Sequence, residues 1–227
     1  IPMDYLTRLH LTLSLPTMTW AVITLVLAIP AICNPRKVLK LQILSSNALI
    51  LIFTVSFVSV VDKALEPFAC AFNPDGSLSM QADPKIECRS TEWWFYYALP
   101  ALAWLTAYTA LPLWLTVRLS YSGDNGRWAG ERFTFRAYAS FYRKYKRTVF
   151  AWELCVLARK FALVAAVVLL NLYPLRACMV FLATVMACVV LNKAHKPYEN
   201  MEDNALEELV LLALALMAFS GIVFYAP

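Results

Sequence analysis

Charged side chains inside two long apolar stretches are the first chemical feature of this sequence. Glu153, Arg159 and Lys160 lie in one stretch, and Glu207 and Glu208 stand at the start of the other. A charge that faces lipid at the centre of a membrane costs roughly 2.5–3.5 kcal/mol, so these side chains are expected to face one another or the membrane interface. We predict that Arg159 or Lys160 pairs with Glu207 or Glu208 across two helices. The alternative is that these groups line an ion path or a gate.

Two of the cysteines differ from the others in their surroundings. Cys70 and Cys88 share the polar segment 68–92. The remaining four lie in or beside apolar stretches, where cysteine behaves as a small hydrophobic residue: Cys33, Cys155, Cys178 and Cys188. A Cys70–Cys88 disulfide would fit an oxidising compartment, and closing such a loop contributes roughly 3 kcal/mol in the chain-entropy account. Two free thiols are the alternative.

Signatures of enzymes and of metal sites are scarce. The two histidines, His10 and His195, lie outside the expected membrane segments. The sequence has no HExxH, CxxC or GxSxG motif and no phosphate-binding glycine loop. We therefore expect neither enzymatic activity nor a cofactor.

The composition indicates that these groups belong to a membrane protein. Hydrophobic residues make up 61% of the chain, charged residues 15%, and the mean hydropathy is +0.60. Soluble proteins have about 45–50% apolar and about 25% charged residues. A soluble domain of 227 residues could not bury so much apolar surface. The composition excludes a disordered chain, a coiled coil and a nucleic-acid-binding protein.

Six apolar segments are expected to cross the membrane as helices of about 20 residues each. The expected spans are residues 17–33, 41–61, 93–117, 149–173, 174–192 and 205–225. The fourth contains the charges described above, so its first half is expected at the interface. The predicted fold is an all-α membrane protein, a six-transmembrane-helix bundle with one interfacial amphipathic helix. The whole of 1–227 forms one domain in this prediction.

The distribution of basic residues predicts the orientation of this bundle. With the first loop in the cytosol, 15 of the 20 Lys and Arg residues but only 8 of the 15 acidic residues lie on the inner side. Basic residues favour the cytosolic side of membrane proteins. We therefore expect an extracellular N-terminus, an extracellular C-terminus and an extracellular 68–92 loop.

The segment 131–150 is expected to form the interfacial helix on the inner side. Aromatic and apolar residues recur there at helical spacing: Tyr138, Phe141, Tyr142, Tyr145 and Val149. Basic residues surround that face: Arg136, Arg143, Lys144, Lys146 and Arg147. Such a helix lies in the headgroup plane, where anionic lipid of the inner leaflet contributes about 1 kcal/mol per basic residue. Ordinary anchoring and the specific docking of a phosphoinositide or a protein partner are both open interpretations.

Aromatic side chains are expected to form belts at both membrane interfaces. Those expected at the outer end of the third span are Trp93, Trp94, Tyr96 and Tyr97. Those expected at the inner interface are Tyr142, Tyr145 and Trp152. Their amphipathic rings suit the headgroup level. For the four outer residues a ligand-binding aromatic box is the alternative.

Several short motifs follow one another in a distinctive order. They are the loop 68–88 with its Asp-Gly and Asp-Pro pairs, the tyrosine-rich basic stretch 142–147, Trp152-Glu153, Arg159-Lys160, the segment 195–198, Asn204 and Glu207. In this order they resemble the multi-pass C-terminal region of very large cell-surface proteins of algae and other protists, over roughly residues 39–216. A more distant similarity is to transient-receptor-potential (TRP)-like membrane proteins of fungi.

The resemblance implies a membrane anchor for a large extracellular region ahead of Ile1. Because one kind of member is the axial protein of flagellar mastigonemes, it implies the plasma membrane or a ciliary membrane. A channel or cytoskeletal protein is the partner expected at the basic inner helix. The chain opens on Ile1 without an initiator Met, so we expect it to be a piece of a longer protein. The alternative is a TRP-like ion channel or a channel-associated subunit. Against that alternative, the segment 193–204 is short and polar and holds no pore helix or glycine filter.

Overall fold

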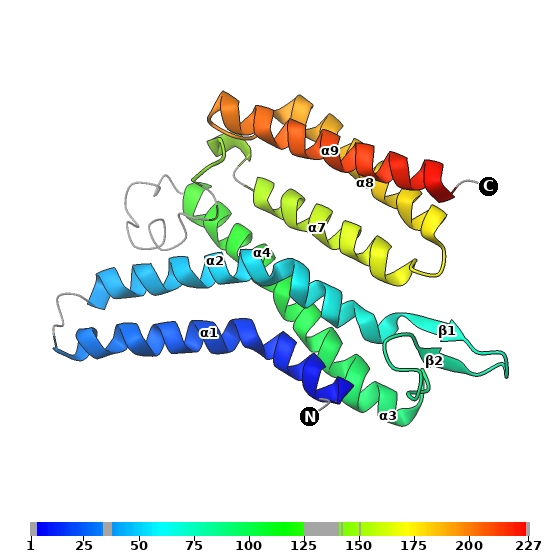
Figure 1. Ribbon diagram of the computed structural model, residues 1–227. Coiled ribbons are helices and arrows are strands. Elements are labelled where there is room, and N and C mark those ends of the chain that lie inside the picture. The colour runs from blue at the N-terminus through cyan, green and yellow to red at the C-terminus, as the bar shows by residue number, and fades with distance from the viewer. Residues whose placement is uncertain (1–3, 34–37, 125–140, 142, 150, 226–227) are drawn as a thin grey trace.

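Long helices that alternate in direction along the chain dominate the fold (Figure 1). The computed structural model describes residues 4–33, 38–124, 141, 143–149 and 151–225. The long helices in this part of the chain are α1 (Tyr5–Cys33), α2 (Val38–Leu65), α4 (Leu99–Asp124), α7 (Trp152–Leu169), α8 (Pro174–His195) and α9 (Met201–Tyr225). The first turn of α1 and the last turn of α9 lie at the same end of the molecule (Figure 1).

The first helix begins earlier than the expected span 17–33. Pro16, a residue type that disfavours a helix interior, lies within the observed helix. In the structure, Leu9 and Leu13 are only 1% and 0% exposed, while Arg8 and His10 point outward from the same turns. Burial of one apolar face therefore extends the helix through Pro16 to Tyr5.

One apolar core joins α1, α2, α4 and α7. Phe53 of α2 stacks on Tyr108 of α4 with ring centroids 4.9 Å apart, and Phe57 is 2% exposed beside them. Leu13 of α1 and Leu157 of α7 belong to the same cluster. This core fixes the middle of the molecule.

A second, smaller core lies between α7, α8 and α9. Val185 of α8 and Leu211 of α9 are fully buried, and Leu163 of α7 packs against them. Because α7 contributes to both cores, its polar residues are enclosed by helices from two sides. Of the charges of α7, Glu153 is buried, and Arg159 and Lys160 are half-buried.

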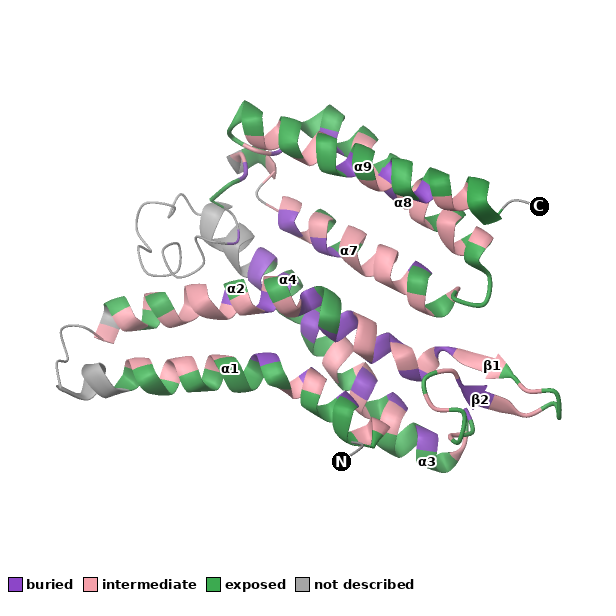
Figure 2. Cartoon of the chain, in the orientation of Figure 1, coloured by how far each residue is buried: buried purple, intermediate pink, exposed green. Residues whose placement is uncertain are grey.

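The outward faces of the helices are strongly apolar. On α2, Leu51 and Val55 are 62% and 73% exposed, and on α9 Leu212 and Leu216 are 55% and 60% exposed. Figure 2 shows exposed residues along the whole length of α9. Contiguous exposed apolar faces of this size are unusual for soluble proteins. They suggest that lipid covers the helices.

Five helical segments of the described chain are long and apolar enough to cross a membrane. They are Tyr5–Ala28, Lys40–Phe68, Thr91–Val117, Pro174–His195 and Met201–Tyr225. The expected fourth span, 149–173, is not among them, because α7 contains three charged residues, Glu153, Arg159 and Lys160. By length and composition the structure thus supports an all-α fold with five candidate spans, one fewer than expected.

A β-hairpin that the sequence analysis did not predict connects α2 to the next helix. After a 3-10 turn (Glu66–Phe68), β1 (Cys70–Phe72) pairs antiparallel with β2 (Leu78–Met80). The left-handed backbone of Gly76, with φ +84°, lies at the tip.

A π-helical turn joins that hairpin region to α4. The segment runs from α3 (Thr91–Trp93) through the π-helical turn (Trp94–Ala98) into α4. Pro100 follows this turn, and a proline ring clashes with the carbonyl four residues earlier in a regular α-helix. The wider turn gives room for the proline, and the helix continues.

Candidate functional site

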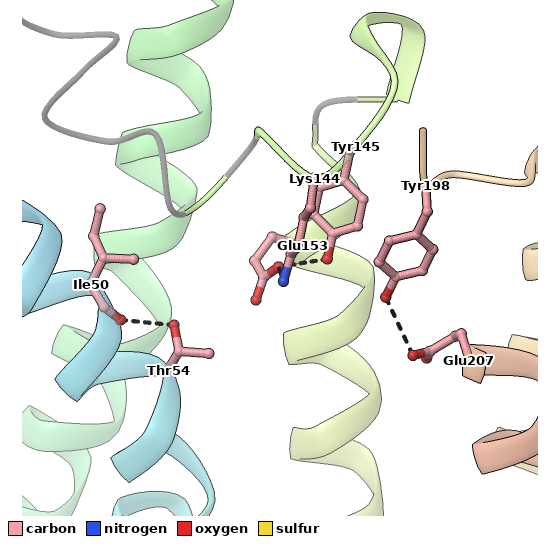
Figure 3. A network of polar contacts seen from close by, with 7 residues as sticks. All are labelled: Ile50, Thr54, Lys144, Tyr145, Glu153, Tyr198 and Glu207. Atoms are coloured by element: carbon pink, nitrogen blue, oxygen red, sulfur yellow. Dashed lines mark hydrogen bonds and ion pairs between the residues drawn. The ribbon is translucent and has the colours of Figure 1, made fainter. Parts of the chain in front are cut away.

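A cluster of polar side chains lies at the end of the molecule opposite the hairpin. We call it the tyrosine–carboxylate cluster, and its members are Lys144, Tyr145, Glu153, Arg159, Tyr198 and Glu207. They come from the segment 143–149, from α7, from the α8–α9 turn and from α9. Figure 3 shows how Tyr145 and Tyr198 face each other between the two glutamates.

The segment 143–149 reaches the cluster through its backbone. The Lys146 N–H donates to the carbonyl of Pro197 at 2.8 Å, and the Glu199 N–H donates to the carbonyl of Lys144 at 3.2 Å. Between these bonds, Tyr145 and Tyr198 form an isolated antiparallel bridge. The centroids of their rings lie 5.1 Å apart. A basic loop is thereby tied to the α8–α9 turn.

The expected amphipathic helix over 131–150 does not extend through its last part, although Phe141 is helical. Residues 143–149 form a turn, the bridge and a 3-10 helix (Arg147–Val149). The physical reason is that Tyr145 buries its ring, at 3% exposure, and bonds to another part of the chain. Residues 131–140, with Arg136, and also Tyr142 lie outside the described residues. So does the side chain of Arg147.

Glu153 is the most deeply buried charge of the cluster. It is 2% exposed, and its Oε2 accepts a hydrogen bond from the Tyr145 hydroxyl at 2.6 Å. The Lys144 Nζ lies 2.7 Å from the same oxygen. Burial and the nearby Glu153 carboxylate raise the pKa of Tyr145, so its hydroxyl remains a donor. A buried carboxylate needs such partners to offset its loss of hydration.

Arg159 and Glu207 form the second centre of the cluster. The Arg159 Nη1 donates to Glu207 Oε1 in an ion pair between α7 and α9. The Tyr198 hydroxyl donates to Glu207 Oε2 at 3.3 Å. The structure thus brings together one of the predicted combinations. Lys160 and Glu208 are half-buried, and no ion pair of either is found within the described residues.

Asn204 fixes the turn that carries Tyr198. Its Oδ1 accepts from the Tyr198 N–H at 3.2 Å, and its Nδ2 donates to the Tyr198 carbonyl at 2.9 Å. Lys196 adopts a left-handed conformation with φ 41° as the C-cap of α8. The predicted ion pair did not include Glu153, and no contact of Tyr198 or Asn204 was predicted, although all three residues belong to the ordered motifs. Their membership of those motifs was the sequence feature that could have indicated a shared site.

The basic residues expected to meet lipid headgroups differ in their roles. Arg143 is exposed, as expected for such a role, and Lys146 is half-buried. Lys144 instead directs its ammonium group to Glu153, and its side chain is 43% exposed. A lipid headgroup that binds Lys144 would therefore compete with Glu153 for the ammonium group.

The expected outer aromatic belt holds for only part of its members. Trp94 and Tyr96 are 45% and 57% exposed. Trp93 is 5% exposed, and its indole N–H donates to the carbonyl of Pro67 at 2.9 Å, so it braces the hairpin. Tyr97 is half-buried and packs against Tyr5 with ring centroids 5.9 Å apart.

The inner aromatic residues also turn toward the protein. Tyr145 is buried in the cluster, contrary to the expectation of a ring in the acyl boundary. Trp152 is half-buried and lies against His195 with centroids 5.8 Å apart. Hydrogen-bond partners within the fold explain why the ring of Tyr145 is withdrawn from lipid.

The disulfide between Cys70 and Cys88 is present at the other end of the molecule. The two Cα atoms lie 6.5 Å apart, and the bond links β1 to the segment that precedes α3. This confirms the predicted bridge. Trp93 packs edge-on against Phe68 beside it, with centroids 5.9 Å apart.

The tyrosine–carboxylate cluster and the disulfide both form structural contacts. Within the described residues, no group of three or more His, Cys, Asp or Glu side chains could hold a metal ion. The tyrosine–carboxylate cluster satisfies buried charges, and the disulfide closes the hairpin. Both devices fix neighbouring helices relative to one another.

No protein-family model, curated protein or solved structure matches the chain.

Proposed function

We propose that the chain is a multi-pass membrane anchor for a large extracellular region, at the cell surface or on a ciliary appendage. Six helices cross the bilayer in this proposal: α1, α2, α4, α7, α8 and α9. The termini and the disulfide-closed hairpin face the exterior. The tyrosine–carboxylate cluster faces the cytosol.

We include α7 among the spans because the partners of its charged residues lie within the fold. Its 18 residues extend about 27 Å, close to the roughly 30 Å hydrocarbon thickness. Glu153 stands in its first turn and Arg159 about two turns further, and both have partners within the fold. The second half of α7, from Phe161 onward, carries no charge. Helices on both sides therefore shield its polar half from lipid.

The proposed orientation has support from both ends. The cluster end holds the basic residues Arg143, Lys144, Lys146, Lys193 and Lys196. Basic residues favour the cytosolic side, where anionic inner-leaflet lipid would bind the exposed Arg143. The hairpin end holds the disulfide, which favours an oxidising exterior.

The observation that carries the proposal is that the charges between the helices are held in fixed contacts. Glu153 is bonded by Lys144 and Tyr145, and Glu207 by Arg159 and Tyr198. Groups that conduct ions must exchange partners, whereas an anchor needs helices that resist separation. A cluster in which each carboxylate has two donors fits the second requirement.

A surface-display experiment tests the anchor. A folded reporter domain with a signal peptide is fused ahead of Ile1, and cells are stained without permeabilisation. The proposal expects the reporter at the surface and its retention in the membrane pellet after alkaline carbonate extraction. A reporter that is released, or that is stained only after permeabilisation, would overturn it.

Planar bilayers test the channel alternative. Purified chain should give no unitary currents. Reproducible openings, with ion selectivity that changes in an Arg159→Lys variant of normal expression, would favour a TRP-like channel. A Lys85→Arg variant, altered on the hairpin instead of in the cluster, is the matched control.

A further inference from the structure

A cavity of about 390 Å³ lies beside the tyrosine–carboxylate cluster, between α7, α8 and α9. Arg159, Asn192 and Glu207 contribute to its polar lining, and Cys155, Ala187 and Leu191 contribute to its apolar wall. Its volume falls in the range of small-molecule sites, roughly 300–1,000 Å³.

Asn192 is the unexplained group of this cavity. Its side chain is 2% exposed, yet neither Nδ2 nor Oδ1 has a hydrogen-bond partner within the described residues. Leaving a buried polar group unpaired is costly, and most such groups in proteins have partners. Thr184, which lines the same cavity, donates its hydroxyl to the Val180 carbonyl at 2.8 Å. The unmet hydrogen bonds therefore belong to the Asn192 amide.

The charge of the lining limits what could bind. Arg159 and Glu207 neutralise each other through their ion pair, so the polar part of the lining has no net charge. An anionic headgroup would have to compete with Glu207 for the guanidinium. A neutral polar group avoids that competition.

The remaining wall faces outward and is apolar. Cys155, Ala158, Ala187 and Leu191 line the cavity and are exposed on the helix surfaces. If the chain lies in a membrane, this side of the cavity faces lipid. A ligand could therefore enter from the bilayer.

We propose that this cavity binds a neutral lipid whose head is a hydroxyl group. A hydroxyl can donate to the Oδ1 and accept from the Nδ2 of one amide, and so meets both needs of Asn192. The apolar body of the lipid covers the wall formed by Ala187 and Leu191. A sterol and a diacylglycerol both offer this chemistry. The inference requires the membrane location in the proposed function but not the anchoring role.

Photolabelling of the full chain in lipid nanodiscs tests the site. Three photoactivatable probes are compared: a sterol, a diacylglycerol and phosphatidylserine. We expect the sterol or the diacylglycerol to label peptides from α7 or α8, in competition with its unlabelled counterpart. The probe that labels identifies the source of the hydroxyl. Preferential labelling by phosphatidylserine, or labelling of these peptides by none of the probes, would overturn the proposal.

Two variants connect the labelling to the cavity. Asn192→Leu removes both polar atoms with little change in size and should reduce labelling at least fivefold. Ala187→Phe should reduce it as well, because the added ring occupies the apolar wall. Asn47→Leu is the matched control, since the Asn47 Nδ2 already donates to the Ile43 carbonyl at 2.9 Å in another helix. Equal labelling of Asn192→Leu and the unaltered chain would contradict the proposal.

A stability measurement covers the case in which a variant folds poorly. Without added lipid, Asn192→Leu should unfold at the same or a higher temperature, because an unpaired buried amide has been replaced by an apolar group. The hydroxyl lipid should raise the Tm of the unaltered chain and not that of Asn192→Leu. An equal rise in both would place the lipid elsewhere. Because neither assay depends on an extracellular region, a failed anchor test leaves this result interpretable.

Discussion

The guanidinium of Arg159 on α7 and the carboxylate of Glu207 on α9 form an ion pair across 48 positions of the sequence. The two side chains are only 12% and 16% exposed. Tyr198 supplies a second donor to Glu207, at 3.3 Å. The pair joins α7 to α9 and lies beside the cavity that contains Asn192.

Removing one partner of this pair should destabilise the protein more than removing both. Glu207→Leu leaves the Arg159 charge enclosed without its counter-ion, and the expected loss is roughly 3 kcal/mol in the free energy of unfolding. The double variant Arg159→Leu/Glu207→Leu should recover most of that loss. Unfolding by SDS in mixed micelles measures all three forms.

Glu208→Leu is the control for that cycle, because Glu208 is half-buried on the same helix and forms no ion pair in the described chain. This substitution should change the free energy of unfolding by less than about 1 kcal/mol. Strictly additive losses from Arg159→Leu and Glu207→Leu would mean that the two groups do not interact.

Tyr198 should make stability sensitive to alkaline pH. Burial and then the Glu207 carboxylate raise the pKa of Tyr198 to about 12, against about 10 in an unfolded chain. The folded state thus holds this proton more tightly. The associated stability is complete below about pH 10 and is lost as the pH rises towards about 12.

Tyr198→Phe should therefore lose less stability than the unaltered chain between about pH 10 and about pH 12. Thermal unfolding in buffered detergent across this interval measures the difference. Tyr173→Phe is the control, since Tyr173 is 53% exposed at the other end of the molecule. Identical pH profiles for Tyr198→Phe and the unaltered chain would remove Tyr198 from the explanation.

Opening the disulfide should weaken the hairpin end. The Cys70–Cys88 bond spans a sequence separation of 18, for which the chain-entropy account gives roughly 3 kcal/mol. Cys70→Ala/Cys88→Ala should lower the Tm, and reductant should lower the Tm of the unaltered chain only. Peptide mass spectrometry without reduction should detect the crosslink, and two alkylated thiols would show that it is absent.

A close approach of α8 and α9 should make Gly221 hard to replace while Cys178 is present. A β-carbon added to Gly221 would stand 2.8 Å from the Cys178 Sγ and 3.9 Å from its Cβ. Gly221→Ala should therefore destabilise the unaltered protein. In a Cys178→Ala background the same change should be neutral or should stabilise by up to about 1 kcal/mol, because alanine favours helix over glycine.

Ser220→Ala, an exposed neighbour on α9, is the control for that pair and should have little effect. If Gly221→Ala destabilises equally in both backgrounds, the contact with Cys178 is not the cause.

The helices and the disulfide were predictable from the sequence because their signals are local. Long uncharged stretches predict helices by composition alone, and Cys70 and Cys88 are separated from the other cysteines by their polar surroundings. The ends of helices were less predictable. The start of α1 depends on Leu9 and Leu13 packing against distant helices, which periodicity near Pro16 does not reveal.

The tyrosine–carboxylate cluster was only half predictable for a related reason. Enclosed charges need partners, and that requirement predicted a pair of Arg159 or Lys160 with Glu207 or Glu208, of which Arg159 with Glu207 is formed. It did not indicate that Tyr145 would turn inward, because helical spacing and a lipid-facing ring were an equally good explanation of its pattern. The bridge to Tyr198 is a non-local contact. Trp93 was misjudged likewise, since its partner Pro67 lies 26 residues away.

The central claim is that the hairpin and the tyrosine–carboxylate cluster lie on opposite sides of a membrane. Cysteine accessibility tests it most directly. Single cysteines at two exposed positions, Asp75→Cys and Glu202→Cys, are compared in a chain that keeps the Cys70–Cys88 disulfide. The other four cysteines are replaced by alanine: Cys33, Cys155, Cys178 and Cys188.

A membrane-impermeant maleimide is then applied to intact cells and to permeabilised cells. The account predicts that Asp75→Cys is labelled in intact cells and that Glu202→Cys is labelled only after permeabilisation. Labelling of Glu202→Cys in intact cells, or of both positions equally, would contradict it.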